Sequence, residues 1–263
     1  MKVGFIGAGN MGSALAKAAA KTNAEIFISD KDEKKRDDLA KEIGAYSTDT
    51  KKIAEECEYI FLAVKPNIIK TVLREINETV SSRPDAVIVS MAAGVSISEI
   101  EAVISDKVQI IRIMPNTPVA IGKGMILWCT NSALNEKQAT AFENLLSKAG
   151  ELDRIDERLI DAASAVSGCG PAFVYMFIEA LSDGAVECGL PRDKAQRYAA
   201  ETLIGAAELL KATGKHPGEL KDAVCSPGGS TISGVHALEE KSFRSAVEGA
   251  IVASYKKTLS LSK

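Results

Sequence analysis

Two glycine-rich turns, one near each end of the chain, carry the residue types and spacings that could do chemistry. The first is Gly7-Ala8-Gly9-Asn10-Met11-Gly12, which fits G-x-G-x-x-G between a predicted strand and a predicted helix. In that setting the first glycine makes the tight turn, the second admits a pyrophosphate, and the third lets helix and strand pack closely. The helix start then offers free N–H groups to the phosphates. The sequence therefore predicts a dinucleotide site formed by Gly7, Ala8, Gly9, Asn10, Met11 and Gly12.

The second turn lies in "CSPGGSTISGVHALE", residues 225–239. Pro227, Gly228 and Gly229 force an irregular turn, and Ser230 and Thr231 follow where a helix-like run begins. The N–H groups and the dipole of a helix start favour an anion. A plain loop between two helices would have the same pattern, so the choice depends on what the first turn binds.

The acid at the end of the second predicted strand bears on the choice of cofactor. Asp30 follows the central glycine by about twenty residues, where an acid bonds the ribose 2′-hydroxyl and repels a 2′-phosphate, which favours NAD. Four cations follow, however, and could hold that phosphate or form a solvated helix face: Lys31, Lys34, Lys35 and Arg36. NADH and NADPH both stay open as the cofactor.

Three later segments follow predicted strands, at the edge where doubly wound sheets bind ligands. Two of them, "AVKP" and "MAAG", have small residues that leave room for a ribose and a nicotinamide, although ordinary strand-to-helix turns look alike. The third, Arg112–Gly124, is stiffened by Pro115 and Pro118 and presents a side-chain amide. We predict cofactor contacts by Ala63, Val64, Lys65, Pro66, Met91, Ala92, Ala93, Gly94 and Asn116.

The elements that must position these residues change in type near the middle of the chain. Apolar runs typical of strands alternate with helical periods in the first half, at 2–6, 25–29, 58–64, 85–91, 109–114 and 125–130. This pattern predicts an α/β fold with a parallel, doubly wound, Rossmann-type sheet. Helical spacing alone follows, at 158–166, 172–187, 192–212, 217–224, 231–239 and 243–260. We predict a dinucleotide-binding domain over 1–155 and an all-helical domain for substrate binding and oligomerisation over 156–263.

Composition excludes several classes of function. A net charge of -3 with dispersed cations argues against a nucleic-acid partner. Residues 1–20 are interrupted by glycines, so neither a signal peptide nor a membrane partner is expected. The five cysteines have no C-x-x-C pair and only two histidines occur, which indicates a reduced, cytoplasmic protein without a metal site.

A long stretch without lysine narrows the chemistry. Dehydrogenases of similar architecture that act on β-hydroxy acids use a lysine on the helix entering the second domain, yet none occurs between Lys148 and Lys194. The region instead has a glycine-rich break at Ser167-Gly168-Cys169-Gly170. A hydroxy-acid dehydrogenase is therefore disfavoured, and a sensor that binds nucleotide without turnover is the non-enzyme alternative.

Seven segments together resemble the pyrroline-5-carboxylate reductase family over essentially the full length: "FIGAGNMGSA", "AVKP", "MAAGV", "RIMPNTP", "SGCGPAFVY", "GLPRDKA" and "HPGELKDAVCSPGGSTISGVHALE". The resemblance implies an N-terminal Rossmann domain, a C-terminal all-α dimerisation domain, and NADH or NADPH as cofactor. It also implies a small-molecule substrate and a homodimer that assembles into a larger homo-oligomer such as a decamer. The implied activity is hydride transfer to the imine carbon of L-1-pyrroline-5-carboxylate, the final step of proline biosynthesis.

That chemistry is consistent with the missing lysine, because a cyclic imine can enter already protonated and needs no strong side-chain acid. The resemblance places the hydroxyl of Thr231 beside the ring nitrogen, as the catalytic group. It implies that the substrate carboxylate contacts Ser226 and the N–H groups of Gly229, Ser230 and Thr231. We also assign Val166 and Ser167 to the substrate site.

Some residues depart from the family pattern. Cys169 stands where serine is frequent, and Ser230 where threonine or alanine is frequent. Cys169 and Cys225 are expected to be buried and inert, although thiols facing the cleft would make the enzyme sensitive to oxidation. His216 is expected to start a helix. His236 is expected to be a packing or surface residue rather than a catalyst.

Overall fold

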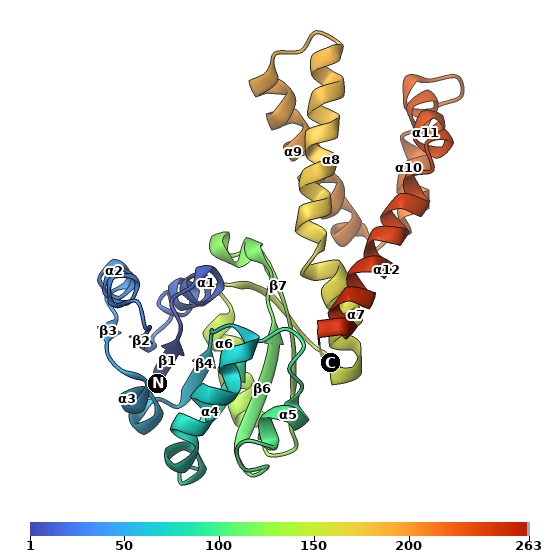
Figure 1. Ribbon diagram of the computed structural model, residues 1–263. Coiled ribbons are helices and arrows are strands. Elements are labelled where there is room, and N and C mark those ends of the chain that lie inside the picture. Colours follow the sequence, from blue (N-terminus) through green and yellow to red (C-terminus); the bar gives the residue numbers. More distant parts are fainter. Residues whose placement is uncertain (262–263) are drawn as a thin grey trace. The chain divides into compact units, whose positions relative to one another are not determined.

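The computed structural model describes residues 1–261, and its internal contacts divide the chain into two compact units. The first unit is Met1–Cys169 with the C-terminal stretch from Ser254, and the second is Gly170–Ala253. Figure 1 shows a sheet with covering helices in the first unit and helices alone in the second. The expected fold class is thereby confirmed.

One sheet of eight strands forms the centre of the first unit, in the order β3-β2-β1-β4-β5-β6-β7-β8. The strands are β1 (Lys2–Ile6), β2 (Glu25–Ser29), β3 (Tyr46–Ser47), β4 (Tyr59–Leu62), β5 (Val87–Ser90), β6 (Gln109–Met114), β7 (Gly124–Thr130) and β8 (Gly150–Arg154). The sequence pattern does not predict β3, which is two exposed residues, or β8, which is mostly polar.

The expectation of a wholly parallel sheet is wrong at one pairing. β6 and β7 run antiparallel, with Met114 opposite Leu127, whereas the other neighbours are parallel. The link between them is a short 3-10 helix, η1 (Thr117–Ile121), and a parallel connection would need a crossover of about a dozen residues or more.

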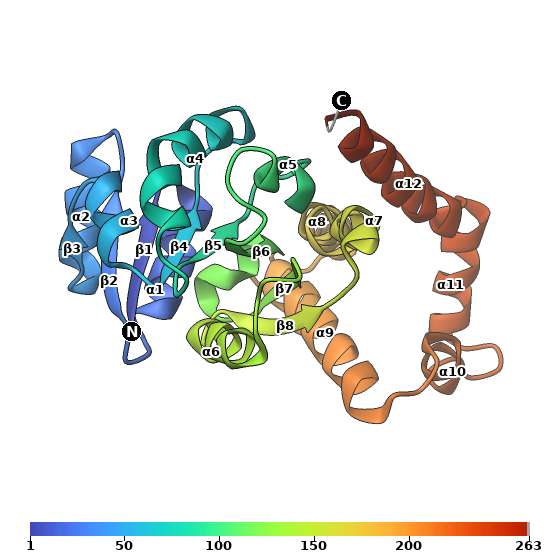
Figure 2. The same cartoon turned by 90° about the horizontal axis from the view of Figure 1, so that it is seen from below.

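Helices cover both faces of the sheet, as Figure 2 shows from below. They are α1 (Asn10–Ala19), α2 (Glu33–Ile43), α3 (Thr50–Glu56), α4 (Pro66–Ser81), α5 (Ile97–Glu101), α6 (Glu136–Leu146) and α7 (Glu157–Ser167). Successive strand residues face opposite layers, so Phe5 packs in one apolar cluster with Leu15 and Phe142, and Ile6 in another with Leu73. These two layers are the core of a doubly wound sheet.

Helix α7 belongs to the first unit by its packing. Its Ile160 is fully buried in the cluster that contains Ile97 and Cys129. The first unit therefore runs through Cys169, whereas the sequence places a domain boundary after residue 155. The predicted boundary at 155/156 separates the residues by their expected roles in binding cofactor and substrate, and this division of roles stays a prediction.

The second unit contains α8 (Gly170–Glu187), α9 (Arg192–Thr213), α10 (Pro217–Ala223), α11 (Ser230–Glu240) and the first part of α12 (Phe243–Leu261). Among residues 170–253, the buried side chains are Ser182, Ala195 and Ala199. Large apolar side chains are exposed instead, including Tyr175 at 62% and Met176 at 68%. This unit therefore has very little interior of its own.

One helical stretch, Glu157–Glu187, is long and apolar enough to cross a membrane by length and composition. It consists of α7 and α8, which are separated by a turn at Gly168 and Cys169. Length and composition are weak evidence for a membrane span, since helices that pack in soluble proteins meet the same criteria.

Candidate active site

The first glycine turn depends on glycine at two positions. Gly7 has a φ of +111°, and a Cβ there would lie 2.4 Å from the backbone oxygen of Ala63. A Cβ on Gly12 would lie 2.4 Å from the backbone oxygen of Gly7. The N–H of Gly7 donates to the backbone oxygen of Ser29 at 2.7 Å. The turn therefore lies so close to Ala63 after β4, and α1 so close to the turn, that no side chain fits at Gly7 or at Gly12.

Gly9 differs, because a Cβ built there meets nothing within 4 Å. It is the N-cap of α1, in extended backbone with no side-chain cap, so the first N–H groups of the helix are left to other partners. The protein itself does not require glycine at this position. An open approach to uncapped N–H groups is what a pyrophosphate needs, so the turn fits a dinucleotide.

A cavity of about 320 Å³ opens at this turn. It is lined by Gly9, Asn10, Met11, Gly12, Ala63, Val64, Lys65, Met91, Met114 and Pro115. All of these except Met114 and Pro115 are predicted cofactor residues. The sequence does not predict these two: Met114 is the last residue of β6, and Pro115 begins the loop after it, in which Asn116 is the predicted cofactor residue.

Besides Asp30 and Asn116, six predicted cofactor residues lie outside the cavity lining: Gly7, Ala8, Pro66, Ala92, Ala93 and Gly94. Ala8 is a buried residue of the turn itself, and Pro66 begins α4. Ala92 is 2% exposed and packs in the core, while Gly94 takes a φ of +72°. Their backbone shapes the edge of the sheet, and their contacts with cofactor stay predictions.

Asp30 is fixed against the glycine turn. Its Oδ2 accepts a hydrogen bond of 2.6 Å from the N–H of Ala8, and its Oδ1 accepts one of 2.8 Å from the N–H of Asp32. The carboxylate therefore stands beside the turn at the carboxyl end of β2, the position the sequence assigns to recognition of the ribose.

Asn116 is buried and works within the protein. Its Nδ2 donates to the backbone oxygen of Ser167 at 2.8 Å, and its Oδ1 accepts from the N–H of Met125 at 2.9 Å. Both ends of the amide thus join the loop after β6 to β7 and to α7. A direct cofactor contact by Asn116 stays a prediction. What the structure shows is that this side chain links three elements of the protein through its two hydrogen bonds.

The substrate residues predicted on α7 lie at its last turn. Val166 is 59% exposed. The Oγ of Ser167 is buried and has no hydrogen-bond partner among residues 1–261. A buried hydroxyl without a protein partner is able to hydrogen-bond a ligand.

The second glycine turn is a separate group of residues within the helical unit. Gly228 has a φ of +69°, and the N–H of Gly229 donates to the backbone oxygen of Ser226 at 3.0 Å. A Cβ on Gly229 would lie 2.4 Å from the Oγ of Ser226, so the serine side chain covers this glycine. Gly229 is the N-cap of α11 and has no side-chain cap, while Ser230 and Thr231 begin the helix.

This turn has the features of an anion site. The uncapped N–H groups of the first turn of α11 lie beside the hydroxyls of Ser226, Ser230 and Thr231, all on exposed residues. The helix dipole adds partial positive charge at the same end. The structure thus brings Ser226, Gly229, Ser230 and Thr231 together, whereas Val166 and Ser167 belong to the other compact unit.

The free thiols differ in their surroundings. Burial raises the pKa of Cys57 and of Cys129 to about 12, so both stay protonated in the core. Cys169 and Cys225 are half-buried, so the expectation that they are buried is wrong. Each follows or precedes an irregular glycine turn, where side chains pack less densely than in the sheet core.

An ion-pair cluster fastens α7 to the sheet. Arg112 of β6 is 3% exposed and donates to Glu157 at 3.1 Å and to Asp161 at 2.9 Å. Glu157 also accepts from the N–H of Ile97 at 2.7 Å. No group of three or more histidine, cysteine, aspartate or glutamate side chains in the described part of the chain could hold a metal ion.

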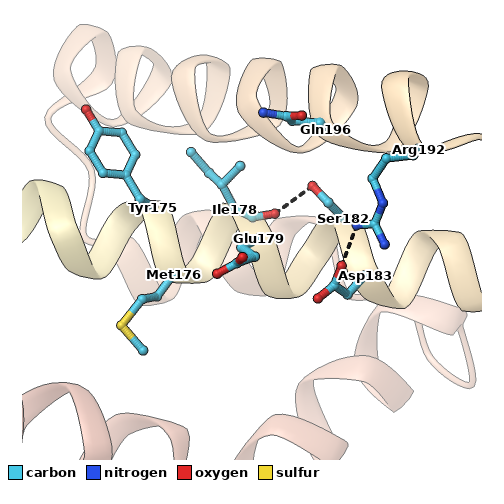
Figure 3. A pocket seen from close by; sticks show the side chains of 8 residues that line it. All are labelled: Tyr175, Met176, Ile178, Glu179, Ser182, Asp183, Arg192 and Gln196. Atoms are coloured by element: carbon cyan, nitrogen blue, oxygen red, sulfur yellow. Dashed lines mark hydrogen bonds and ion pairs between the residues drawn. The ribbon is translucent and has the colours of Figure 1, made fainter.

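A further cavity, of about 560 Å³, lies between α8 and α9. Figure 3 shows Arg192 paired with Asp183 and the hydroxyl of Ser182 bonded to the backbone oxygen of Ile178. Exposed Tyr175 and Met176 form part of its lining. None of the predicted site residues lies here, and its lining includes exposed apolar surface of the helical unit.

The doubly wound sheet, the glycine turn and its cavity define an oxidoreductase that uses a nicotinamide dinucleotide, NADH or NADPH. Residues 2–94 match the family model described as NADP oxidoreductase, coenzyme F420-dependent, and residues 157–261 match the one described as pyrroline-5-carboxylate reductase dimerisation.

Relatives agree over the whole chain. A pyrroline-5-carboxylate reductase of Escherichia coli is 39% identical over 100% of this chain and 98% of its own length. Pyrroline-5-carboxylate reductase 3 of Danio rerio is 42% identical over 97% of this chain and 89% of its own. The pyrroline carboxylate reductase of Plasmodium falciparum, solved with NADP bound, has a TM-score of 0.88 at 32% identity, covering 100% of this chain and 98% of that one. The chain belongs to the pyrroline-5-carboxylate reductase family, as its motifs predict.

Proposed function

We propose that this chain reduces L-1-pyrroline-5-carboxylate to L-proline with NAD(P)H, the final step of proline biosynthesis. The observation that carries the proposal is the pair of uncapped glycine turns, at Gly9 for the pyrophosphate and at Gly229 for an anion. The relatives are named for a substrate that carries a carboxylate, which supports this carboxylate as the anion at the second turn.

Residues of the first unit would hold the cofactor. The N–H groups that follow Gly9 bind the pyrophosphate, and Asp30 binds the adenosine ribose. Small side chains such as Ala63 leave room for the nicotinamide ribose. When bound, the cofactor supplies the hydride that adds to the imine carbon.

The turn before α11 would hold the substrate. Main-chain N–H groups of Gly229, Ser230 and Thr231 and the hydroxyl of Ser226 grip the carboxylate. Helix-end placement contributes about 0.3–2 kcal/mol per charge, and hydrogen bonds to a charged group about 1.5–3 kcal/mol each. Together these are enough to orient a small acid. Val166 and the unpaired hydroxyl of Ser167 are proposed as further substrate contacts.

Thr231 would hydrogen-bond the protonated ring nitrogen of the substrate. The imine enters protonated, so the step breaks its C=N double bond, adds hydride to carbon and leaves the original proton on nitrogen. A hydroxyl beside that nitrogen accepts a hydrogen bond from the iminium and orients the ring. This accounts for a site without a lysine acid.

The chain forms a homo-oligomer, in keeping with its dimerisation region. We propose that a second copy covers the exposed apolar side chains of the helical unit, such as Tyr175 and Met176. We propose that such dimers assemble into a decamer. We also propose a cytoplasmic location without a nucleic-acid or membrane partner, because the net charge is -3 with dispersed cations and the five cysteines form no C-x-x-C pair. Sedimentation of the purified chain over a range of concentrations tests the number of subunits.

Purified protein mixed with the imine and NADH or NADPH tests the activity. Loss of cofactor absorbance with formation of L-proline supports the proposal. Folded protein that binds a dinucleotide but turns over neither cofactor with this imine would refute it.

A further inference from the structure

The site beside β2 discriminates between two cofactors that differ by one group. NADH carries a hydroxyl on the 2′ carbon of the adenosine ribose, and NADPH carries a phosphate there. In this fold that carbon lies near the end of the second strand. The charge and hydrogen bonds at the end of β2 therefore decide which cofactor binds.

Asp30 is held in place by the protein before any cofactor arrives. Hydrogen bonds from the N–H groups of Ala8 and Asp32, of 2.6 and 2.8 Å, occupy one site on each carboxylate oxygen. Each oxygen keeps a second lone pair, so the group can still accept from a ribose hydroxyl. A phosphate has no such donor at neutral pH and meets the fixed negative charge.

The cations nearby are partly committed elsewhere. The Nζ of Lys35 pairs with Asp32 at 3.4 Å, and the Nε of Arg36 pairs with Asp37 at 2.8 Å. These pairs draw the two cations toward acids of α2 and its N-cap. What remains for a 2′-phosphate is Lys31 and Lys34, both exposed and without a side-chain ion pair in residues 1–261.

The local charge does not favour a phosphate either. Residues 30–37 contain four acids and four cations, so they carry no net positive charge. A site for a 2′-phosphate usually places an arginine where it can bind two phosphate oxygens. Here the arginine of this segment, Arg36, already pairs with Asp37.

We propose that this chain binds NADH in preference to NADPH, and that the fixed carboxylate of Asp30 selects between them. The proposal deepens the proposed function by naming its cofactor. It can fail on its own, because an imine reductase that prefers NADPH would keep the function and lose this inference.

The test measures binding without substrate, by the fluorescence of NADH and NADPH titrated with the folded oligomer. Wild-type protein is expected to bind NADH at least about tenfold more tightly, as for a site that places a like charge against the competitor. Asp30→Asn keeps an oxygen for one of the two N–H groups but removes the charge. It should lower the preference about tenfold or more, mainly by strengthening NADPH binding.

Glu33→Gln is the matched control. It removes the same charge from the first turn of α2, where the carboxylate has no side-chain hydrogen bond or ion pair within residues 1–261. The ratio of the two dissociation constants should change less than about threefold, because surface charges interact weakly. Thermal unfolding of each variant without cofactor checks that it is folded.

A second control tests the free cations. Lys31→Gln combined with Lys34→Gln should change NADPH affinity less than about threefold if these exposed side chains are only solvated.

Three results would overturn the inference: equal or tighter binding of NADPH by wild type, an unchanged ratio in Asp30→Asn, or an equal shift in Glu33→Gln. Failure of both cofactors to bind would remove the dinucleotide site and with it the proposed function.

Discussion

The side-chain amide of Asn116 donates a hydrogen bond of 2.8 Å to the backbone oxygen of Ser167, joining the loop after β6 to the end of α7. The same amide accepts from the N–H of Met125 at the start of β7. One buried side chain therefore holds three elements at the edge of the sheet where the predicted cofactor residues gather.

Replacing Asn116 should lower the stability of the folded protein. Asn116→Ala leaves the carbonyl of Ser167 and the N–H of Met125 without this partner in a buried place, which costs about 1–3 kcal/mol. Urea unfolding measures the loss. Asn77→Ala removes a surface hydrogen bond to Ser81 and should change stability by less than about 0.5 kcal/mol. Equal losses of stability in the two variants would contradict the structural role of Asn116.

The glycines of the first turn should separate binding from folding. Gly9→Ala adds a methyl group that meets no protein atom, so unfolding without cofactor should be unchanged. Dinucleotide affinity should fall about tenfold or more, since the methyl occupies the approach of the pyrophosphate. Gly12→Ala places a Cβ 2.4 Å from the oxygen of Gly7 and should destabilise the unit by about 1–3 kcal/mol. A Gly9→Ala protein with normal affinity would show that the cofactor lies elsewhere.

Thr231 should matter for turnover and little for cofactor. Thr231→Val keeps the shape but removes the hydroxyl proposed to accept a hydrogen bond from the protonated ring nitrogen. Loss of a hydrogen bond to a charged group should lower kcat about a hundredfold. Affinity for the dinucleotide should change less than about twofold. Thr231→Ser restores a hydroxyl and should recover most of the lost kcat. A parallel loss of cofactor affinity and kcat would mean that this role is misassigned.

The buried ion pairs of Arg112 should contribute more to the free energy of unfolding than an exposed ion pair. Arg112→Met leaves Glu157 and Asp161 without their cation and should cost about 3 kcal/mol, the lower end of the range for breaking a buried pair, because both acids are partly exposed. Arg158→Ala breaks the surface pair with Asp156, whose carboxylate still caps α7, and should cost at most about 1 kcal/mol. Denaturant unfolding of both variants tests this order.

The thiols should react in the order of their exposure. At pH 8 a disulfide reagent should modify exposed Cys188 first, and Cys57 and Cys129 only after unfolding. Burial raises the pKa of the last two from about 9 to about 12, so the folded state holds their protons more tightly than the unfolded state. Their contribution to stability is therefore complete below pH 9 and is lost as the pH rises toward 12.

Alkaline unfolding monitored by circular dichroism checks the second part. Cys57→Ala with Cys129→Ala should reduce the loss of stability between pH 9 and 12. Fast modification of Cys57 in the folded protein would contradict the burial argument.

Sequence periodicity was sufficient for the elements that bury an apolar face. Lys2–Ile6, Glu25–Ser29 and Gln109–Met114 match their strands end to end, because each is bounded by polar or turn residues. Tyr46–Ser47 and Gly150–Arg154 escaped prediction because they are paired at or near the sheet edges and mostly exposed. They are stabilised by strand pairing and by a few side-chain contacts, such as the stacking of Tyr46 on Phe27 and the packing of Leu152 against the core. Such long-range contacts leave no periodic pattern in a single sequence.

The site was predictable where backbone shape dictates residue type. Gly7 and Gly12 have no room for a side chain, and G-x-G-x-x-G records that constraint. Met114 and Pro115 escaped prediction because an apolar lining looks like any strand end. The role of Asn116 was not readable either, since its partners Met125 and Ser167 are brought to it only by the folded chain.

Few side chains are buried in Gly170–Ala253, and this affects how many assembled molecules form from a given number of chains in the cell. A helical unit that lacks an interior must receive one from another chain, so its completion depends on encounters between chains. Halving the number of chains made would then lower the number of complete molecules by more than half.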